Sequence, residues 1–294
     1  MTTSVFNKIQ KNENSQRSAP MTPFSVLISV YQKDDPALFK RALQSVYDNS
    51  LSPSEVLLVQ DGPVTAELKD VIAEFEDRYG LRTIALEKNQ GLAAALNVGL
   101  KHIEHEFVFR ADADDFNLPD RFEKQLPVLE EGYDLVGGAI QEVDNEGNEI
   151  AIRQPPTSGA KIRARCRYRC PFNHMTVCYR KSAVMACGGY PNIHLKEDYA
   201  LWAKMIANQS KCLNLEDVLV KATTGHAMYE RRGGAAYVRS ELNMQHLLIR
   251  CGLQNWLGAI STGLARSLVF IAPAKIRGWV YETFLRQKPG KSAG

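Results

Sequence analysis

The 294-residue sequence lacks the features that mark several classes of protein. Its formal net charge is only +3, and no dense basic run is interleaved with aromatic residues, so it is not typical of a nucleic-acid-binding protein. Residues 1–20 lack the apolar core of a signal peptide, and the six cysteines imply no extracellular disulfide framework. We therefore expect a cytoplasmic protein in which residues 1–20 form a disordered tail.

What the sequence does contain is 45% hydrophobic residues, arranged in βα units. An apolar run over 24–30 predicts a buried strand and is followed by a helical pattern over 35–47. A second strand is predicted over 56–59 and a third over 81–86, and each is followed by a helical pattern. This alternation predicts an α/β fold with a mostly parallel, Rossmann-like sheet flanked by helices.

The pattern changes after the next strand, which is predicted over 107–109. A helix is expected over 118–130, and residues 134–152 are typical of a hairpin that turns at 145–148. A further helix begins near 196. The sequence therefore predicts a mixed sheet, in which antiparallel pieces follow the βα repeats.

Three carboxylates, Asp112, Asp114 and Asp115, directly follow the strand at 107–109. Open α/β sheets bind ligands beyond the carboxyl ends of their strands. Acids this close together repel one another unless a cation lies among them, and carboxylate oxygens are hard ligands that suit Mg²⁺ or Mn²⁺. We therefore expect a divalent-cation site here, with a solvated acidic turn that caps the next helix as the alternative.

Two other metal sites are indicated by spacing alone. Asp112, Asp114 and Glu123 match positions 1, 3 and 12 of an EF-hand loop, but Phe116 and Asn117 stand where that loop needs an oxygen ligand and a glycine. The second set has four possible ligands at intervals of four residues: Cys166, Cys170, His174 and Cys178. Pro171 interrupts the helix that would align them, so we do not predict a zinc site.

A set of short motifs resembles a known family. These are Ser-Val-Tyr at 29–31, Gln-Asp-Gly at 60–62, Asn-Gln-Gly at 89–91, Arg-Ala-Asp-Ala-Asp-Asp at 110–115 and Glu-Asp at 197–198. Their order is similar to that in family 2 inverting glycosyltransferases with the GT-A fold, especially bacterial enzymes of exopolysaccharide, capsule or lipopolysaccharide synthesis such as the amylovoran type. The resemblance covers about residues 23–232.

The resemblance implies a nucleotide-diphosphate sugar as donor, with a UDP-sugar expected, and a glycan or a polyprenyl-diphosphate-linked glycan as acceptor. It implies Mn²⁺ or Mg²⁺ on Asp114, with Asp112 as a second metal residue that also lies near the ribose. Asp198 is implied as the catalytic base, accompanied by Glu197. Gln60 departs from the acid usual at that position. The donor-binding residues that we expect are Tyr31, Asp61, Asn89, Gly91, Arg110, Asp112, His174, Arg231 and Arg232.

For Asp61 and for the pair Arg231 and Arg232, a purely structural role is as good an interpretation as donor binding. Asp61 stands before a Gly-Pro turn, where a carboxylate either contacts a ligand or caps a helix. The guanidinium groups of Arg231 and Arg232 are suited to diphosphate oxygens, but a basic turn of this kind is also typical of a solvated surface.

The C-terminal part combines apolar and basic residues. Its apolar residues at helical spacing are Leu253, Trp256, Leu257, Ile260, Leu264 and Ile271. Its basic residues, opposed by Glu282 alone, are Arg250, Arg266, Lys275, Arg277, Arg286, Lys288 and Lys291. The uncharged run 251–265 is shorter than a membrane span. The pattern indicates either a helix on the inner surface of the cytoplasmic membrane or helices that pack on protein.

We thus predict a tail over 1–20, a GT-A catalytic domain over 21–234 and an amphipathic helical extension over 235–294. Two other classes share some of these features. A sugar nucleotidyltransferase has a similar core, but residues 29–33 do not form the Gly-rich phosphate loop of that class. A non-catalytic sugar-nucleotide-binding protein would not need both acidic clusters.

Overall fold

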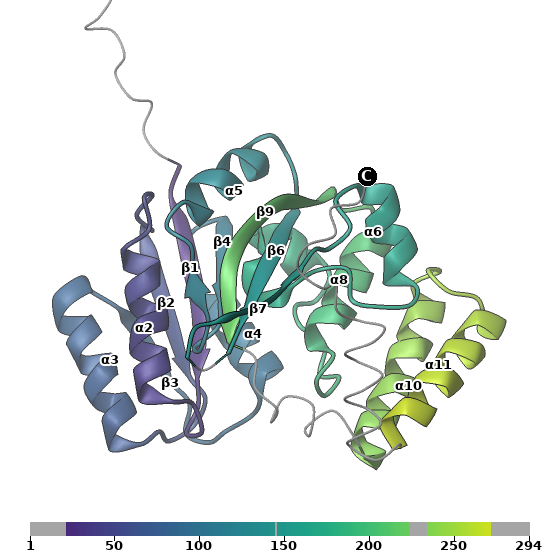
Figure 1. Cartoon of the computed structure of the whole chain (residues 1–294), viewed down its shortest axis with the longest axis horizontal. Helices are drawn as coiled ribbons and strands as arrows, with labels where there is room; N and C mark the ends of the chain where they lie inside the picture. The colour runs from purple at the N-terminus through teal and green to yellow at the C-terminus, as the bar shows by residue number, and fades with distance from the viewer. Residues whose placement is uncertain (1–21, 145, 224–233, 272–294) are drawn as a thin grey trace, which may run out of the picture.

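The computed structural model describes residues 22–144, 146–223 and 234–271 (Figure 1). Its centre is a mixed sheet in the order β3-β2-β1-β4-β8-β6-β9-β5, with β7 paired to β6. The strands are β1 (Phe24–Val30), β2 (Glu55–Gln60), β3 (Arg82–Ala85), β4 (Phe107–Ala111), β5 (Phe116–Asn117), β6 (Leu135–Val143), β7 (Glu149–Arg153), β8 (Cys178–Arg180) and β9 (Cys212–Thr223).

Helices cover both faces of this sheet. They are α2 (Pro36–Tyr47), α3 (Ala66–Tyr79), α4 (Leu92–His102), α5 (Arg121–Glu130), α6 (Gly159–Cys166), the 3₁₀ helix η1 (His174–Thr176), α7 (Lys181–Ala186), α8 (Glu197–Ala207), α10 (Ala235–Arg250) and α11 (Trp256–Ile271). Alternate residues of β1 separate the two cores: Val26 and Ile28 pack in the core that α2 and α3 close, whereas Leu27 packs in the core of α4 and α8.

The first half of the sheet is parallel, as predicted. β1 pairs in parallel with β2 and β4, and β2 pairs in parallel with β3. The connecting helices have ordinary end signals: Asp35 caps α2 by accepting from the backbone N–H groups of Ala37 and Leu38, at 2.8 and 3.0 Å. The carboxyl ends of β1, β2 and β4 therefore meet at one edge.

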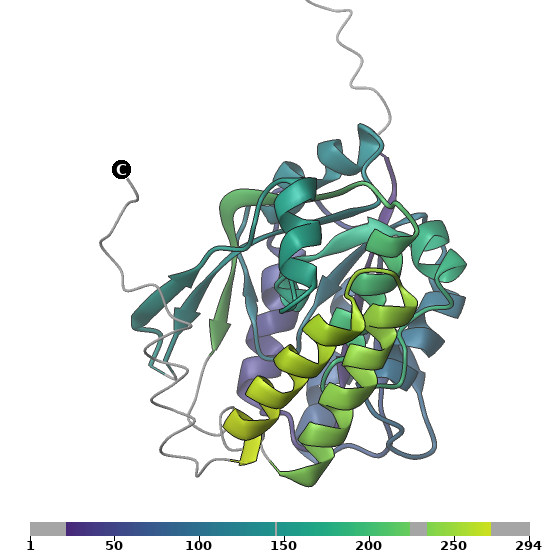
Figure 2. The ribbon, with the colours of Figure 1, turned by 90° about the vertical axis from the view of Figure 1, so that its right-hand side faces the viewer.

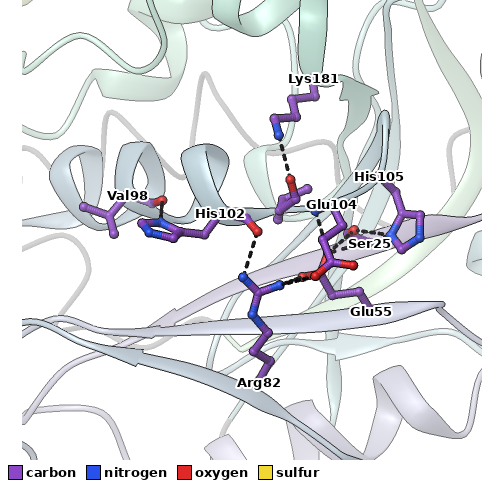
Figure 3. A network of polar contacts seen from close by, with 9 residues as sticks. Ser25, Glu55, Arg82, Val98, His102, Glu104, His105 and Lys181 are labelled. Atoms are coloured by element: carbon purple, nitrogen blue, oxygen red, sulfur yellow. Dashed lines mark hydrogen bonds and ion pairs between the residues drawn. The ribbon is translucent and has the colours of Figure 1, made fainter.

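A polar network fixes the opposite edge, where these strands begin (Figure 3). Glu55, at the start of β2, accepts from the Ser25 hydroxyl at 2.5 Å and pairs with Arg82 at 2.5 Å. Glu55 also accepts from the backbone N–H of Glu104 at 3.0 Å, just before β4. The network thus joins the beginnings of four strands, which leaves their far ends to present functional side chains.

The second half of the sheet is mixed. β8 is antiparallel to β4 and β6, and β6 and β7 form the predicted hairpin. The long strand β9, parallel to β6, is not predicted by the pattern above. The helix expected from residue 118 begins instead at Arg121, because Phe116 and Asn117 form β5 on β9 and Asn117 is held by the Ser45 hydroxyl at 3.0 Å.

The C-terminal helices α10 and α11 form a hairpin beside α8 (Figures 1 and 2). Met244 and Leu248 of α10, with Leu253 of the turn, share a core with Trp202 of α8. The packing interpretation therefore holds for α10. Four large apolar residues of α11, however, are each more than half exposed: Trp256, Leu257, Ile260 and Leu264.

Candidate active site

Arg110 lies near the carboxyl end of β4, at the centre of the candidate site. Its side chain is 1% exposed, and its guanidinium forms an ion pair with Asp112. Its Nε and Nη1 atoms have no hydrogen-bond partner among the described residues. Because buried N–H groups without partners are costly, this guanidinium is suited to an anionic group that binds against it.

The acidic loop after β4 is held by the end of β9. Thr223 donates its backbone N–H to Asp115 Oδ1 at 3.2 Å and its hydroxyl to the Asp114 carbonyl at 3.1 Å. Asp115 is buried, and burial together with the charges of Asp112 and Asp114 raises its pKa well above the ordinary value. The interpretation as a solvated acidic turn is therefore wrong. The residue that precedes α5 is Asp120, whose side chain makes no capping bond.

Asp34 is a candidate site residue that no motif above indicates. Its Oδ2 accepts from the Tyr31 backbone N–H at 2.9 Å, which closes a tight turn after β1. Burial raises the pKa of Asp34 to about 7, and the charges of Asp114 and Asp112 add to that rise. The turn that carries Tyr31 therefore lies beside the acidic loop. The sequence offers one signal for Asp34, namely an acidic residue a few positions after the end of a central strand.

Asp61 follows β2 and holds the loop that begins α4. Its two carboxylate oxygens accept from the backbone N–H groups of Gln90 and Gly91, at 2.7 and 2.9 Å. The Asn89 side chain donates to the Asp61 carbonyl at 3.2 Å. A Cβ atom added to Gly62 would lie 2.4 Å from the Asn89 nitrogen, so this approach requires glycine. Asp61 thus holds the loop before α4, whereas the helix that follows Asp61 in the chain, α3, is capped by Thr65. Contact of Asp61 with a donor stays a prediction.

Glu197 and Asp198 begin α8, on the other half of the sheet. Burial, with the neighbouring charge of Asp198, raises the pKa of Glu197 to about 7. The Cys170 thiol donates to Asp198 Oδ2 at 3.6 Å. Both acids lie where the helix dipole favours a negative charge, yet burial opposes that effect for Glu197.

His174 links the two acidic sets. Its Nε2 lies 3.3 Å from the Tyr190 hydroxyl, and its ring packs on Tyr190 and Trp202 at centroid distances of 5.7 and 6.1 Å. Burial and the charge of Arg110 lower the pKa of His174, whereas Asp198 and Asp112 act in the opposite direction. The ring is therefore a neutral, packed group that feels the charges of both Asp112 and Asp198.

Two further residues clamp the halves together, and neither is indicated by the sequence pattern. Asn97 of α4 accepts from the Tyr190 backbone N–H and donates to the Tyr190 carbonyl, both at 2.8 Å. Gly188 and Gly189, directly before Tyr190, both have positive φ. Arg121 is fully buried and donates to the carbonyls of Arg110 and Val177, at 2.8 and 3.2 Å. It thereby fixes the strand end that carries the acidic loop.

A buried ion cluster supports the start of α8 from the C-terminal helices. Lys196, directly before Glu197, pairs with Glu241 of α10 at 2.8 Å, and both side chains are almost wholly buried. Arg266 of α11 approaches the same carboxylate at 3.3 Å, and Gln245 donates to it at 2.7 Å. The two charges on Lys196 and Arg266 lower the pKa of Glu241 and keep it ionised despite burial.

The carboxylates after β4 suit a divalent cation whose remaining ligands come from a bound substrate and water. Asp112 is already paired with Arg110, and Asp114 is exposed. Among the residues that the structure describes, no three His, Cys, Asp or Glu side chains are arranged as a ready metal cage. Mg²⁺ and Mn²⁺ commonly take one or two carboxylates and complete their shell with water and substrate phosphates. Burial is the main cause of the raised pKa of Asp34 and Asp115, and the repulsion from Asp112 and Asp114 that adds to it is what such a cation would relieve.

Three sets of sequence candidates remain: the Cys/His set, Gly91 and the arginines at 231 and 232. Cys166, Cys170, His174 and Cys178 occupy α6, a loop, η1 and β8, so they do not share one helix. Gly91 precedes α4 with φ of 89°, and the space around its Cβ position is open. Arg231 and Arg232, with residues 1–20 and the tail beyond 271, lie outside the described residues.

Solved structures share this fold. The chain superposes on S. aureus TarS (residues 1–349) with a TM-score of 0.62 and 19% identity, covering 90% of this chain and 76% of that one. It also superposes on the mannosyltransferase PcManGT of Pyrobaculum calidifontis, solved with GDP-Man and Mn²⁺, with a TM-score of 0.60 and 14% identity over 94% and 85% of the two chains. The predicted GT-A fold is confirmed.

The family is equally clear. The model of glycosyl transferase family 2 matches residues 25–189, and the chain belongs to this family. It is 41% identical to an uncharacterized glycosyltransferase of Haemophilus influenzae over 90% of this chain and 99% of that one. It is 37% identical to the UDP-Gal:alpha-D-GlcNAc-diphosphoundecaprenol beta-1,3-galactosyltransferase of Escherichia coli (90% and 97%) and 36% identical to the amylovoran biosynthesis glycosyltransferase AmsE of Erwinia amylovora (88% and 98%).

Proposed function

We propose that the protein transfers a sugar, with inversion, from a nucleotide-diphosphate sugar to a lipid-linked glycan during synthesis of a bacterial surface polysaccharide. The observation that carries this proposal is the presence of two carboxylate sets that both feel the charge of Arg110, which acts on the pKa of Asp34 and on that of Glu197. One set follows the parallel strands, and the other begins α8. A UDP-sugar donor and a polyprenyl-diphosphate-linked acceptor are supported by the name of the galactosyltransferase relative, and the UDP-sugar also by the TarS structure solved with UDP-GlcNAc.

The donor binds, in this proposal, along the ends of β1, β2 and β4. Tyr31 and the loop that Asp61 holds line the nucleotide, and Asp112 lies near the ribose. Arg110 has N–H groups available to an anionic oxygen. Asp114 would hold Mn²⁺ or Mg²⁺, which when bound neutralises the charge of the departing diphosphate.

Asp198 takes the proton of the acceptor hydroxyl. The acceptor oxygen forms a bond to the anomeric carbon from the face opposite the diphosphate, and the bond from that carbon to the diphosphate oxygen breaks. Its electron pair leaves with the nucleoside diphosphate, and the anomeric centre inverts. Glu197 has a pKa raised to about 7, so at neutral pH part of it is protonated and can donate a hydrogen bond to the acceptor.

The test begins with a thermal-shift screen of UDP-, GDP- and dTDP-sugars with Mn²⁺, since a ligand that binds the folded state stabilises it. Transfer is then measured onto a GlcNAc-diphospholipid with a shortened lipid, and the anomeric configuration of the product is read by NMR. A product that retains configuration, or release of pyrophosphate from a sugar phosphate and a nucleotide, would contradict the proposal.

The base is tested by Asp198→Asn. We expect transfer to fall by about 10²- to 10⁴-fold with little change in donor affinity, because a general base contributes roughly that much. Asp70→Asn, an exposed acid on α3, is the matched control and should leave transfer unchanged. Normal transfer by Asp198→Asn with an inactive Glu197→Gln would reverse the two roles.

A further inference from the structure

Helix α6 and the hairpin of α10 and α11 lie on the same side of the molecule, which faces the viewer in Figure 2. Two hydrogen bonds join the turn after α6 to α11 and the residues just before it. Gln254 donates to the Arg167 carbonyl at 3.1 Å, and Arg266 donates to the Tyr168 carbonyl at 3.0 Å. The side chains of the turn and those of α11 therefore belong to one continuous surface.

The α11 part of this surface is apolar. Four large residues at helical spacing are more than half exposed, whereas Ala259 between them is 4% exposed: they are Trp256 at 63%, Leu257 at 61%, Ile260 at 53% and Leu264 at 62%. Tyr168, in the adjacent turn, is 56% exposed. Tryptophan and tyrosine are the residues enriched where a membrane meets water. A contiguous apolar face of this kind indicates an interaction site.

The α6 part of this surface is basic. Residues 150–196 contain nine Lys and Arg residues and no Asp or Glu. The exposed ones on α6 and its turn are Lys161, Arg163, Arg165 and Arg167. Within 235–271 the one acidic residue is Glu241, which is wholly buried. The surface thus presents positive charge and apolar side chains with no exposed acid among these two segments.

We propose that this surface docks on an anionic phospholipid bilayer, with the basic residues of α6 and its turn on the headgroups and the α11 face in the interfacial region. It rests on the proposed function, because a lipid-linked acceptor would lie in that bilayer. The charges also argue against a symmetric contact between two copies, which would place basic residues opposite basic residues. No helix within the described residues is long and apolar enough to span a membrane, so the contact is peripheral.

The position of the surface suits delivery of an acceptor to α8. Arg266, on the docking helix, approaches Glu241, which pairs with Lys196 immediately before Glu197 and Asp198. The ion pairs that Arg266 and Lys196 make with Glu241 therefore connect the proposed membrane contact to the start of α8, which carries the candidate base. The tail beyond 271 adds charge, but the headgroup site proposed here is on α6, more than eighty residues earlier in the chain.

The experiment is flotation of the full chain with phosphatidylglycerol vesicles and, separately, with phosphatidylcholine vesicles, at low and high salt. We expect binding to phosphatidylglycerol that weakens as salt rises. Arg165→Glu with Arg167→Glu, and Leu257→Ser with Leu264→Ser, should each weaken binding about tenfold or more. Lys69→Glu with Lys101→Glu, both exposed on the other half, and Ile152→Ser are matched controls that should bind like the parent.

The proposal is overturned if the full chain does not bind phosphatidylglycerol vesicles, if it binds phosphatidylcholine vesicles equally well, or if neither pair of substitutions weakens binding. A change from dimer to monomer in sedimentation, with vesicle binding unaffected, would also overturn it and assign the surface to a second copy. Donor hydrolysis without vesicles separates the two proposals. It should be the same in all variants, and a chain that binds vesicles but never turns over a sugar nucleotide counts against the proposed function alone.

Discussion

The two halves of the sheet hold their functional residues in different ways. On the parallel half, Asp34, Asp61 and Asp112 each come within a few residues of a strand end, and neighbouring backbone groups orient Asp34 and Asp61. On the mixed half, Glu197 and Asp198 begin a helix whose start is anchored by Lys196 to a carboxylate about forty-five residues later. The proposed donor side is thus held by backbone hydrogen bonds, short-range for Asp34 and long-range for Asp61, whereas the proposed acceptor side depends on buried ion pairs.

This contrast predicts different failures on the two sides. A substitution on the parallel half should affect chemistry and leave the fold intact, because the local loops are supported by the sheet. A substitution in the buried ion cluster should affect the fold of the acceptor side first. The three predictions below separate these outcomes, from the largest effect to the smallest.

Asp114→Asn on the donor side should lower transfer roughly 10³-fold or more, because charge stabilisation by a metal supplies several kcal/mol. The fold should be retained, since Asp114 is exposed. Transfer rates with and without Mn²⁺, beside a circular dichroism melt, check both parts. Asp70→Asn is again the control. Undiminished transfer by Asp114→Asn that needs no metal would remove this residue from the site.

Glu241→Gln on the acceptor side should lower the free energy of unfolding by about 3 kcal/mol, because it leaves the buried Lys196 charge without its partner. The double change Lys196→Met with Glu241→Met removes both charges and should recover most of that loss. Glu74→Gln, in an exposed pair with Lys40, is the control, with an expected change below about 1 kcal/mol. Urea titrations measure all three.

If the double variant is stable but transfers slowly with an unchanged KM for the donor, the ion pair positions the start of α8. If Glu241→Gln is as stable as the parent, the acceptor side does not depend on this cluster, and the contrast between the halves fails.

Glu197→Gln should change how stability depends on pH. The folded pKa of Glu197, about 7, lies above the ordinary value of 4.5. A raised pKa contributes stability that is fully present below 4.5 and is lost as pH rises through about 7. Glutamine cannot ionise, so the variant should melt several degrees higher than the parent at pH 8 and little higher at pH 5. If the parent and the variant melt at the same temperature at both pH values, burial does not raise the pKa of Glu197.

The same contrast explains what the sequence could predict. Strand and helix periodicity located the parallel units, and the acids after β4 stood out because three carboxylates followed an apolar run. Asp34 and Arg121 carried no comparable signal, since their roles come from a turn and from buried carbonyl groups. The roles of Asn97, Lys196 and Glu241 depend on partners far away in the chain, which spacing within one element does not reveal. β9 was missed because its exposed middle breaks the apolar pattern.

The buried guanidinium of Arg110 has a consequence for the empty protein. Two of its nitrogen atoms have no partner among the described residues, and carboxyl groups of raised pKa lie nearby, so this region is locally frustrated. We expect such a centre to lower the stability of the protein without ligand, and the proposed donor to raise that stability by binding there. Substitutions that gave the Arg110 guanidinium a hydrogen-bond partner within the protein should raise the free energy of unfolding and lower the affinity for the ligand.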